Sequence, residues 1–141
     1  MSDRFFLDTN ILVYAFSGQD PVKRTRAMAL LRRAIDDRIG VISWQVVQEF
    51  LQVAIQKNTL SVDVATLTDT IRMVLTPLCR VFPTTELWES AVRIHQQSKY
   101  RFYDSLIVAA AISSGATRLF TEDMQHGHTI GALRIENPFA D

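Results

Sequence analysis

The sequence predicts an α/β fold in three layers (α/β/α), with a short and mainly parallel central sheet. Short apolar runs typical of buried strands alternate with longer stretches in which apolar residues recur every three or four positions, the spacing of a helix. The first run, Phe5–Leu7, has no alternation of apolar and polar residues, which favours a strand covered on both faces. Strands and helices alternate to the end of the chain, as in units that build a parallel sheet.

Length and composition limit the class of protein. The 141 residues are enough for one domain with a hydrophobic core and too few for two, so we expect residues 1–141 to form a single domain. We expect no signal peptide and no membrane span, because no apolar run is long enough for either. Cys79 is the only cysteine, which makes the cytoplasm the simplest setting. The formal net charge is zero, so a nucleic-acid partner needs a local basic patch or a metal ion.

The opening strand delivers a carboxylate. Asp8 follows Phe5–Leu7 directly, at the carboxyl end of the predicted strand, where ligands bind in open α/β sheets. An equally good interpretation is that Asp8 caps the following helix, which we expect over Ile11–Phe16. The loop 17–21 ends that helix.

The segment from Asp20 to about Asp37 predicts a longer helix. Asp20 can cap it, and Pro21 suits a first turn because the N–H that proline lacks has no partner there. Its apolar positions are Ala27, Leu30, Leu31, Ala34 and Ile35. Its basic residues fall largely on other faces, and we interpret them as solvated surface in preference to an RNA-contacting face. They are Lys23, Arg24, Arg26, Arg32 and Arg33.

Gly40–Ser43 predicts a second strand, and Ser43 is placed to cap a helix from Trp44 to about Lys57. The apolar arc of that helix comprises Val46, Val47, Phe50, Val53 and Ala54. Glu49 lies at the border of the arc, in the second turn. A lone acid at such a border is usually a surface residue, but its position after a strand mirrors that of Asp8.

The middle of the chain predicts two helices around a brief strand. Ser61–Leu78 forms the first helix, with Asp63 in its first turn and an end near Pro77. Arg80–Phe82 is the strand. The second helix ends around Lys99, and helix-dipole compensation is a sufficient explanation for Glu86 and Glu89 near its start.

Tyr103–Ile112 is apolar on nearly every face and rich in alanine, which predicts a buried helix that stops at Ser114–Gly115. Asp104 falls in or just before its first turn, where the helix dipole favours a carboxylate whether or not it has a function.

The C-terminal part repeats the pattern of the opening. Arg118–Thr121 predicts a short strand that brings Thr121, Glu122 and Asp123 to its carboxyl end. Leu133–Glu136 predicts the last strand, closed by Asn137–Pro138.

The predicted topology brings Asp8, Glu49, Asp104 and Asp123 to the same edge of the sheet. Four carboxylates in one cleft repel one another and raise one another's pKa unless a cation joins them. With oxygen ligands alone, Mg²⁺ or Mn²⁺ is favoured over zinc. Such ions recruit phosphate oxygens, so the pattern indicates phosphodiester or phosphoryl chemistry.

Four segments, in order, carry a resemblance to a known family: FLDTNILVYAF, ISWQVVQEF, YDSLIVAAA and LFTEDMQHG. On these segments the sequence resembles the PIN-domain ribonucleases, and closely the VapC-type toxins of bacterial toxin–antitoxin pairs. The resemblance spans essentially the whole chain. It implies a PIN-like fold and a metal-dependent endoribonuclease in which water attacks the scissile phosphorus in line and the 3′ oxygen leaves.

The resemblance also implies the roles of individual residues. Asp8, Glu49, Asp104 and Asp123 are expected to be the catalytic acids that bind Mg²⁺ or Mn²⁺. Residues expected to orient these acids or their waters are Asn10, Ser43 and Thr121. Glu122 could supply or supplement the role of Asp123.

Substrate and partners follow from the same resemblance. We expect a transfer or ribosomal RNA substrate, a cognate antitoxin whose tail enters the acidic cleft with an arginine, and a homodimer. Lys99 and Arg101 interleave with aromatic residues immediately before Asp104, as in a single-strand binding edge, although a solvated helix end explains them too. Leu51 and Ile55 are candidates for either protein interface, or for the core.

Three alternatives stay open at this point. Aspartate-nucleophile phosphatases also start with an Asp after a strand, but they place a second Asp where this chain has Asn10. A catalytically inactive PIN-like scaffold could bind RNA or protein without cutting. His126 and His128 could form a zinc pair, although histidines in such a loop are usually solvated.

Overall fold

In the computed structural model of the chain, residues 3–56, 60 and 62–140 are described. The strands form one sheet in the order β3-β2-β1-β4-β6-β5, and all neighbours are parallel except β5 and β6. The strands are β1 (Phe5–Leu7), β2 (Gly40–Ser43), β3 (Cys79–Val81), β4 (Arg118–Phe120), β5 (Thr129–Ile130) and β6 (Leu133–Glu136). The predicted α/β fold with a mainly parallel sheet is confirmed.

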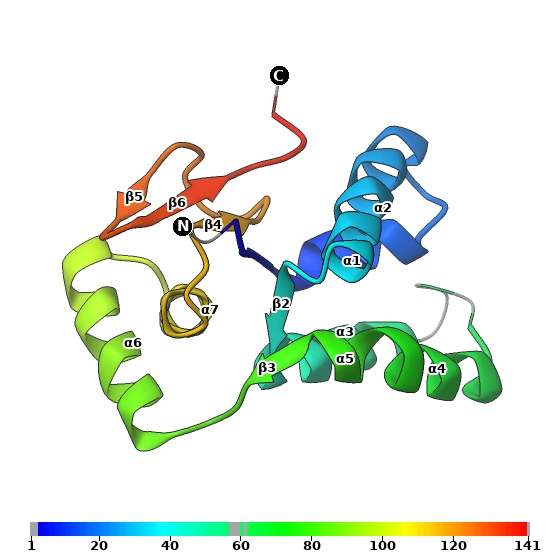
Figure 1. Cartoon of the computed structure of the whole chain (residues 1–141), viewed down its shortest axis with the longest axis horizontal. Helices are drawn as coiled ribbons and strands as arrows, with labels where there is room; N and C mark the ends of the chain where they lie inside the picture. Colours follow the sequence, from blue (N-terminus) through cyan, green and yellow to red (C-terminus); the bar gives the residue numbers. More distant parts are fainter. Residues whose placement is uncertain (1–2, 57–59, 61, 141) are drawn as a thin grey trace.

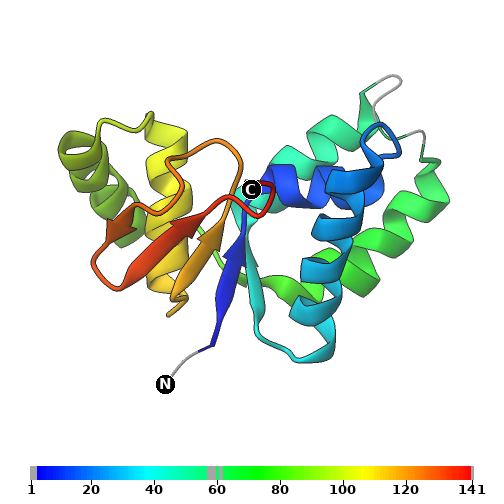
Figure 2. The same cartoon turned by 90° about the horizontal axis from the view of Figure 1, so that it is seen from above.

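Helices cover both faces of the sheet. Figures 1 and 2 show α6 and α7 on one side of the strands and α1 and α2 on the other. The helices are α1 (Thr9–Phe16), α2 (Pro21–Asp36), α3 (Trp44–Ile55), α4 (Val64–Thr70), the π-helical turn η1 (Ile71–Leu75), α5 (Thr76–Leu78), α6 (Thr85–Ser98) and α7 (Phe102–Ser113). No helix in the described part of the chain combines the length and apolar character needed to cross a bilayer.

Strand β1 lies at the centre of the sheet, between β2 and β4. Phe5, Phe6 and Leu7 are fully buried, as expected for a strand covered on both faces. The backbone N–H of Asp8 still donates to the carbonyl of Phe120, at 3.0 Å. The ladder between β1 and β4 therefore fixes the backbone of Asp8 at the carboxyl edge of the sheet.

The first two helices follow their predicted signals with small differences. Helix α1 begins at Thr9, two residues before the predicted start, because the Asp8 side chain accepts a hydrogen bond from the Thr9 N–H and so caps the first turn. Asp20 caps α2 and Pro21 opens it, as predicted. Ile35 is 40% exposed, so it does not belong to the predicted apolar face. One residue turns a helix by about 100°, which carries Ile35 away from buried Ala34.

The segment between α3 and α6 differs most from the prediction. Lys57, the predicted end of one helix, and Ser61, the predicted start of the next, lie outside the described residues. Asp63 itself caps α4 by accepting a hydrogen bond from the Thr66 N–H at 2.7 Å. The helix then widens into the π turn η1 before Pro77, whose ring would crowd the preceding turn of a regular α-helix.

Strand β3 runs one residue earlier than predicted, and half-exposed Phe82 follows it outside the sheet. Helix α7 is buried from Ser105 to Ala111, as its alanine-rich sequence predicts, whereas Tyr103 and Ile112 near its ends are exposed. The two-residue strand β5 was not predicted. It pairs with β6 across a turn in which Gly131 has a φ of +59°, a conformation that glycine adopts readily.

Candidate active site

The carboxyl ends of β1, β2 and β4 meet at one edge of the sheet and carry the predicted acids into a common cleft. Its volume is about 810 Å³. Asp8 follows β1, Glu49 projects from α3, Asp104 from α7 and Asp123 from the loop after β4. The other residues that line this acidic cleft are Thr9, Asn10, Val13, Tyr14, Ser17, Gln19, Gln45, Gln48, Gln52, Val53 and Ile107. The structure thus brings all four acids together.

Asp8 is the most deeply placed of the four, with 5% of its surface exposed. Its Oδ1 accepts from the Thr9 N–H and its Oδ2 from the Thr121 hydroxyl, both at 2.7 Å. Burial raises the pKa of Asp8 to about 7, the two hydrogen bonds oppose the rise, and the charges of Glu49 and Asp123 add to it. Near neutral pH this carboxyl group is therefore about half protonated.

Glu49 is held by two neutral side chains. The Thr9 hydroxyl donates to Glu49 Oε1 at 2.7 Å, and Gln45 Nε2 donates to Oε2 at 3.5 Å. Gln45 lies one turn before Glu49 on α3 and also donates to the backbone carbonyl of Tyr103, at 3.2 Å. These contacts tie the glutamate to α1 and α7.

Asn10 and Thr121 connect the β1 and β4 sides of the cleft. Asn10 Nδ2 donates to Asp123 Oδ2 at 3.0 Å and to the Thr121 hydroxyl oxygen at 3.3 Å. Asn10 Oδ1 accepts from the backbone N–H of Glu122 at 3.2 Å. The predicted orienting residues Asn10 and Thr121 are therefore in direct contact with the acids.

Asp104 lies in the first turn of α7, half-buried at the mouth of the cleft. Burial raises its pKa, Arg101 lowers it, and the charges of Asp123 and Glu49 raise it further, with a net rise. Arg101 Nε lies 3.8 Å from Asp104 Oδ2, and the Arg101 side chain is 89% exposed. The Arg101 side chain therefore lies mostly in solvent, beside Asp104.

Glu122 is not among the residues that line the acidic cleft. Its carboxylate accepts from the Tyr14 hydroxyl at 2.7 Å and forms an ion pair with Lys23. Burial raises the pKa of Glu122, but the hydrogen bonds from Lys23 and Tyr14 lower it more, so the net shift is downward. Lys23, predicted to be solvated surface, instead joins α2 to the loop after β4.

Ser43 and Lys99 are among the predicted residues that do not line the acidic cleft. Ser43 caps α3, where its hydroxyl accepts from the Val46 N–H at 3.4 Å. This hydrogen bond joins Ser43 to the helix that carries Glu49. Lys99 ends α6 in a left-handed conformation, with φ of +67°, and its side chain is exposed.

The donor set suits a hard cation, although the acids do not form a ready-made cage. None of the described residues that line the cleft is a histidine or cysteine, so carboxylate oxygens are the charged ligands on offer. Within residues 3–56, 60 and 62–140, no three His, Cys, Asp or Glu side chains are close enough to hold one metal ion. An incoming cation would have to draw the carboxylates inward from their hydrogen-bond partners.

His126 and His128 have separate partners. His126 Nδ1 accepts from the Asn137 N–H at 2.9 Å, and His128 Nδ1 hydrogen bonds with the Tyr100 hydroxyl at 2.7 Å. Both histidines thus secure the loop between β4 and β6.

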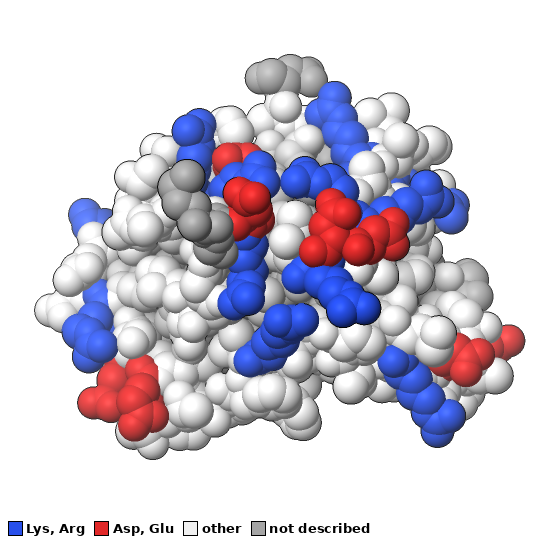
Figure 3. All heavy atoms as spheres, in the orientation of Figure 1, with Lys and Arg blue, Asp and Glu red and all other residues white. Residues whose placement is uncertain are grey.

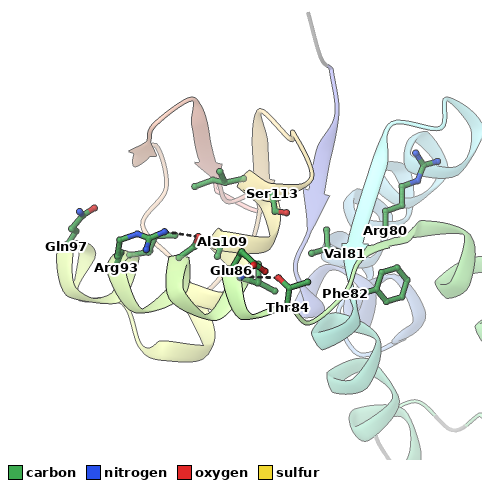
Figure 4. Close-up of a pocket in the computed structure, with 13 residues that line it drawn as sticks. Arg80, Val81, Phe82, Thr84, Glu86, Arg93, Gln97, Ala109 and Ser113 are labelled. Atoms are coloured by element: carbon green, nitrogen blue, oxygen red, sulfur yellow. Dashed lines mark hydrogen bonds between the residues drawn. The ribbon is translucent and has the colours of Figure 1, made fainter.

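A second cleft, of about 550 Å³, lies beside α6 and holds none of the four acids. Figure 4 shows Arg93 and Glu86 on α6, and Arg80 and Phe82 at the other end of this second cleft. On the face of the molecule seen in Figure 3, basic and acidic side chains are interspersed. That face therefore has no broad basic surface.

Sequence reasoning missed Thr9, Gln45, Tyr14 and Lys23. The sequence could have indicated the contact of Gln45, because this residue precedes Glu49 by one helical turn. No sequence pattern indicates the contact of Thr9, because its partner Glu49 lies 40 positions away along the chain.

Comparisons with known proteins agree with this fold. The family description "PIN domain" matches residues 5–129 of the chain. No curated protein sequence matches it. Similar solved structures are of a toxin–antitoxin complex from Klebsiella pneumoniae, FitAcB from Neisseria gonorrhoeae, and VapC20 from Mycobacterium tuberculosis, a sarcin–ricin loop cleaving toxin.

The likeness extends over nearly the whole chain. The Klebsiella structure is 22% identical over 95% of this chain and 97% of its own, with a TM-score of 0.66. FitAcB is 20% identical over 96% and 98%, with a TM-score of 0.65. VapC20 is 20% identical over 84% and 91%, with a TM-score of 0.61. At these identities the solved structures establish the shared fold.

Proposed function

Because the chain belongs to the PIN domain family, we propose that it is a metal-dependent endoribonuclease and the toxin of a toxin–antitoxin pair. The observation that carries this proposal is the acidic cleft, which Asp8, Glu49, Asp104 and Asp123 all line at the carboxyl edge of the sheet. Residues 1–141 would act as one PIN-like domain.

Electrostatics supports a cation in this cleft. Burial raises the pKa of both Asp8 and Asp104, and the carboxylates of Glu49 and Asp123 add to the rise, so a divalent ion would relieve repulsion among these acids. We propose Mg²⁺ or Mn²⁺, held by Asp8 and Asp104 with contributions from Glu49 and Asp123. When bound, such an ion polarises phosphodiester oxygens and lowers the pKa of water.

The chain's own residues prepare the acids for this role. Thr121 and the Thr9 N–H hold the two oxygens of Asp8 in place, and Asn10 holds Asp123. The Thr9 hydroxyl and Gln45 orient Glu49. Because these donors are neutral, they fix the carboxylates without cancelling the negative charge that attracts the cation.

RNA and an antitoxin are the proposed partners. The similarity to VapC20 supports ribosomal RNA as one substrate class to test, with transfer RNA as the other. The similarity to a toxin–antitoxin complex supports an antitoxin, whose arginine could pair with the acids. Arg101 at the mouth of the cleft and Lys99 at the end of α6 are proposed RNA contacts. For a homodimer, Ile55 is the better candidate because it is exposed, whereas Leu51 is half-buried.

The test is cleavage of a mixed pool of transfer and ribosomal RNA by the purified chain, with Mg²⁺ or Mn²⁺ and with chelator. We expect discrete fragments that require the metal and disappear with Asp8→Asn and Asp104→Asn. Removing a metal ligand should lower the rate by at least 100-fold, on the order of what loss of a key transition-state contact costs.

Asp69→Asn is the matched control, because Asp69 is an exposed acid on α4 outside the cleft. It should cut like the wild type. Cleavage that persists in chelator, or in folded Asp104→Asn, would contradict the proposal.

A further inference from the structure

A small pocket with aromatic walls adjoins the acidic cleft. Its volume is about 250 Å³, and its aromatic lining comprises Trp44, Phe82, Trp88 and Tyr103. Between 46% and 68% of the surface of each of these side chains is exposed. Soluble proteins seldom leave such large apolar side chains together in water without a binding role.

The aromatic pocket is continuous with the proposed reaction centre. Gln45 and Gln48, on the first turns of α3, line both the pocket and the acidic cleft. Gln45 also contacts Glu49 on one side and the backbone of Tyr103 on the other. A chain molecule with one phosphate at the acids would therefore reach the aromatic pocket with a neighbouring group.

The ring contacts of the aromatic pocket are not face to face. Trp44 and Phe82 meet at 5.8 Å between centroids but are inclined by 49°, so they do not stack on each other. Tyr103 meets Phe102 edge to face, at an angle of 68°. Exposed rings that are not stacked on each other can receive a flat ligand, and the amides of Gln45 and Gln48 offer donors and acceptors to its edge.

The charge of the chain and the size of the pocket favour a nucleobase as the ligand. The chain has zero net charge and an acidic cleft, so it cannot obtain RNA affinity from bulk electrostatic attraction. Stacking on aromatic side chains is the other main source of affinity for single strands, and it is independent of charge. The pocket is also smaller than the roughly 300–1,000 Å³ typical of drug-sized ligands, which suits one or two planar bases better than a protein segment.

We propose that the aromatic pocket binds an unpaired nucleobase of the RNA, next to the phosphate that lies at the acidic cleft. This inference rests on the proposed function, because it names how the same site holds its substrate. Single-stranded loops, whose bases can turn outward, would then be preferred over duplex RNA.

The chain provides its own probe for this pocket. It has two tryptophans, Trp44 and Trp88, and both line the pocket. A short single-stranded oligoribonucleotide should quench tryptophan fluorescence in a saturable way, with chelator present to prevent cleavage. An abasic ribose-phosphate oligomer of the same length and charge should not quench it.

Two variants locate the effect while retaining both fluorophores. Phe82→Ala and Tyr103→Ala should each weaken oligonucleotide binding by roughly tenfold, in the range measured for loss of one stacked base. Both side chains are exposed, so the variants should fold. Met73→Ala removes an exposed apolar side chain on η1, outside the lining of the pocket, and should bind like the wild type.

The results separate this inference from the proposed function. Metal-dependent RNA cleavage with the same apparent KM in wild type, Phe82→Ala and Tyr103→Ala would overturn the base pocket and leave the nuclease standing. Base-dependent quenching without any cleavage would support the pocket and overturn the nuclease. Equal quenching by the abasic oligomer would overturn the proposed base pocket. If the only effect of the two variants were to convert a dimer to a monomer, the proposal would also be overturned, because a second copy of the chain would then occupy the pocket.

Discussion

Asp8 combines the two roles that the sequence leaves open, because it caps α1 and also lies at the bottom of the acidic cleft. The two roles compete for the same carboxylate. Both oxygens of Asp8 already accept hydrogen bonds, from the Thr9 N–H and the Thr121 hydroxyl, and burial makes its negative charge unfavourable. A carboxylate in such a position is suited to bind a cation, and it destabilises the fold when the cation is absent.

The raised pKa of Asp8 predicts a pH dependence of stability. The group titrates near 3.8 when unfolded and near 7 when folded, so between these values the folded state holds the extra proton. Its contribution to the free energy of unfolding is therefore full below about pH 4 and is lost as pH rises through 7, by on the order of 4 kcal/mol. Urea unfolding of metal-free protein at pH 5 and 7.5 measures most of this loss, about 3 kcal/mol.

Asp8→Asn is the comparison that isolates the effect, because other titrating groups are the same in both proteins. We expect the variant to lose much less stability between pH 5 and 7.5, and to be the more stable protein at pH 7.5. Parallel pH profiles for the two proteins would show that Asp8 titrates normally, despite the nearby Glu49 and Asp123.

At the residue scale, the sequence predicted charged groups better than the neutral groups that hold them. Asp8, Asp104 and Asp123 follow strands or open a helix, and these local features are visible in the chain. The Thr9 hydroxyl reaches Glu49 only because α1 and α3 pack together, and Lys23 reaches Glu122 across 99 positions. Such contacts depend on tertiary packing, which no local pattern encodes.

Helix α3 is the element on which the site depends most. It begins at the Ser43 cap, carries Gln45 and Glu49 into the acidic cleft, and presents Trp44 to the aromatic pocket. If this helix began at a different residue, the residues of both sites would move together.

Ser43→Ala should therefore act through the helix. Loss of the hydrogen bond to the Val46 N–H should lower the free energy of unfolding by about 0.5–2 kcal/mol, the usual cost of losing such a cap. The rate of RNA cleavage should fall along with tryptophan quenching by oligonucleotide. Ser43→Asp, which also caps helices well, should restore stability. If Ser43→Ala changes cleavage but neither stability nor quenching, Ser43 acts directly on the reaction.

Among elements, long periodic or uniformly apolar segments were predicted well and short irregular ones were not. The apolar, alanine-rich sequence of helix α7 and the uninterrupted apolar run of strand β1 each favour a single type of element. Strand β5 has two residues, too few for a period, and exists because β6 lies beside it. The π turn η1 likewise depends on how the helix accommodates Pro77.

For the whole molecule, the position of the site follows from the topology. Parallel strands β1, β2 and β4 end at one edge, and the helices that follow β1 and β2 begin there. This arrangement gathers acids from residues 8 to 123 into one cleft. The alternation of strands and helices was sufficient to predict that edge, but it could not reveal that the aromatic pocket adjoins it.

The central claim is that the acidic cleft binds a divalent cation, and calorimetric titration of Mn²⁺ into the metal-free protein tests it most directly. We expect saturable binding at pH 6 with release of about one proton, because Asp8 holds its proton at that pH and must lose it to the metal. Asp8→Asn and Asp104→Asn should abolish binding, while Asp69→Asn should retain it. Equal Mn²⁺ binding by all four proteins, or none by the wild type, would contradict the claim.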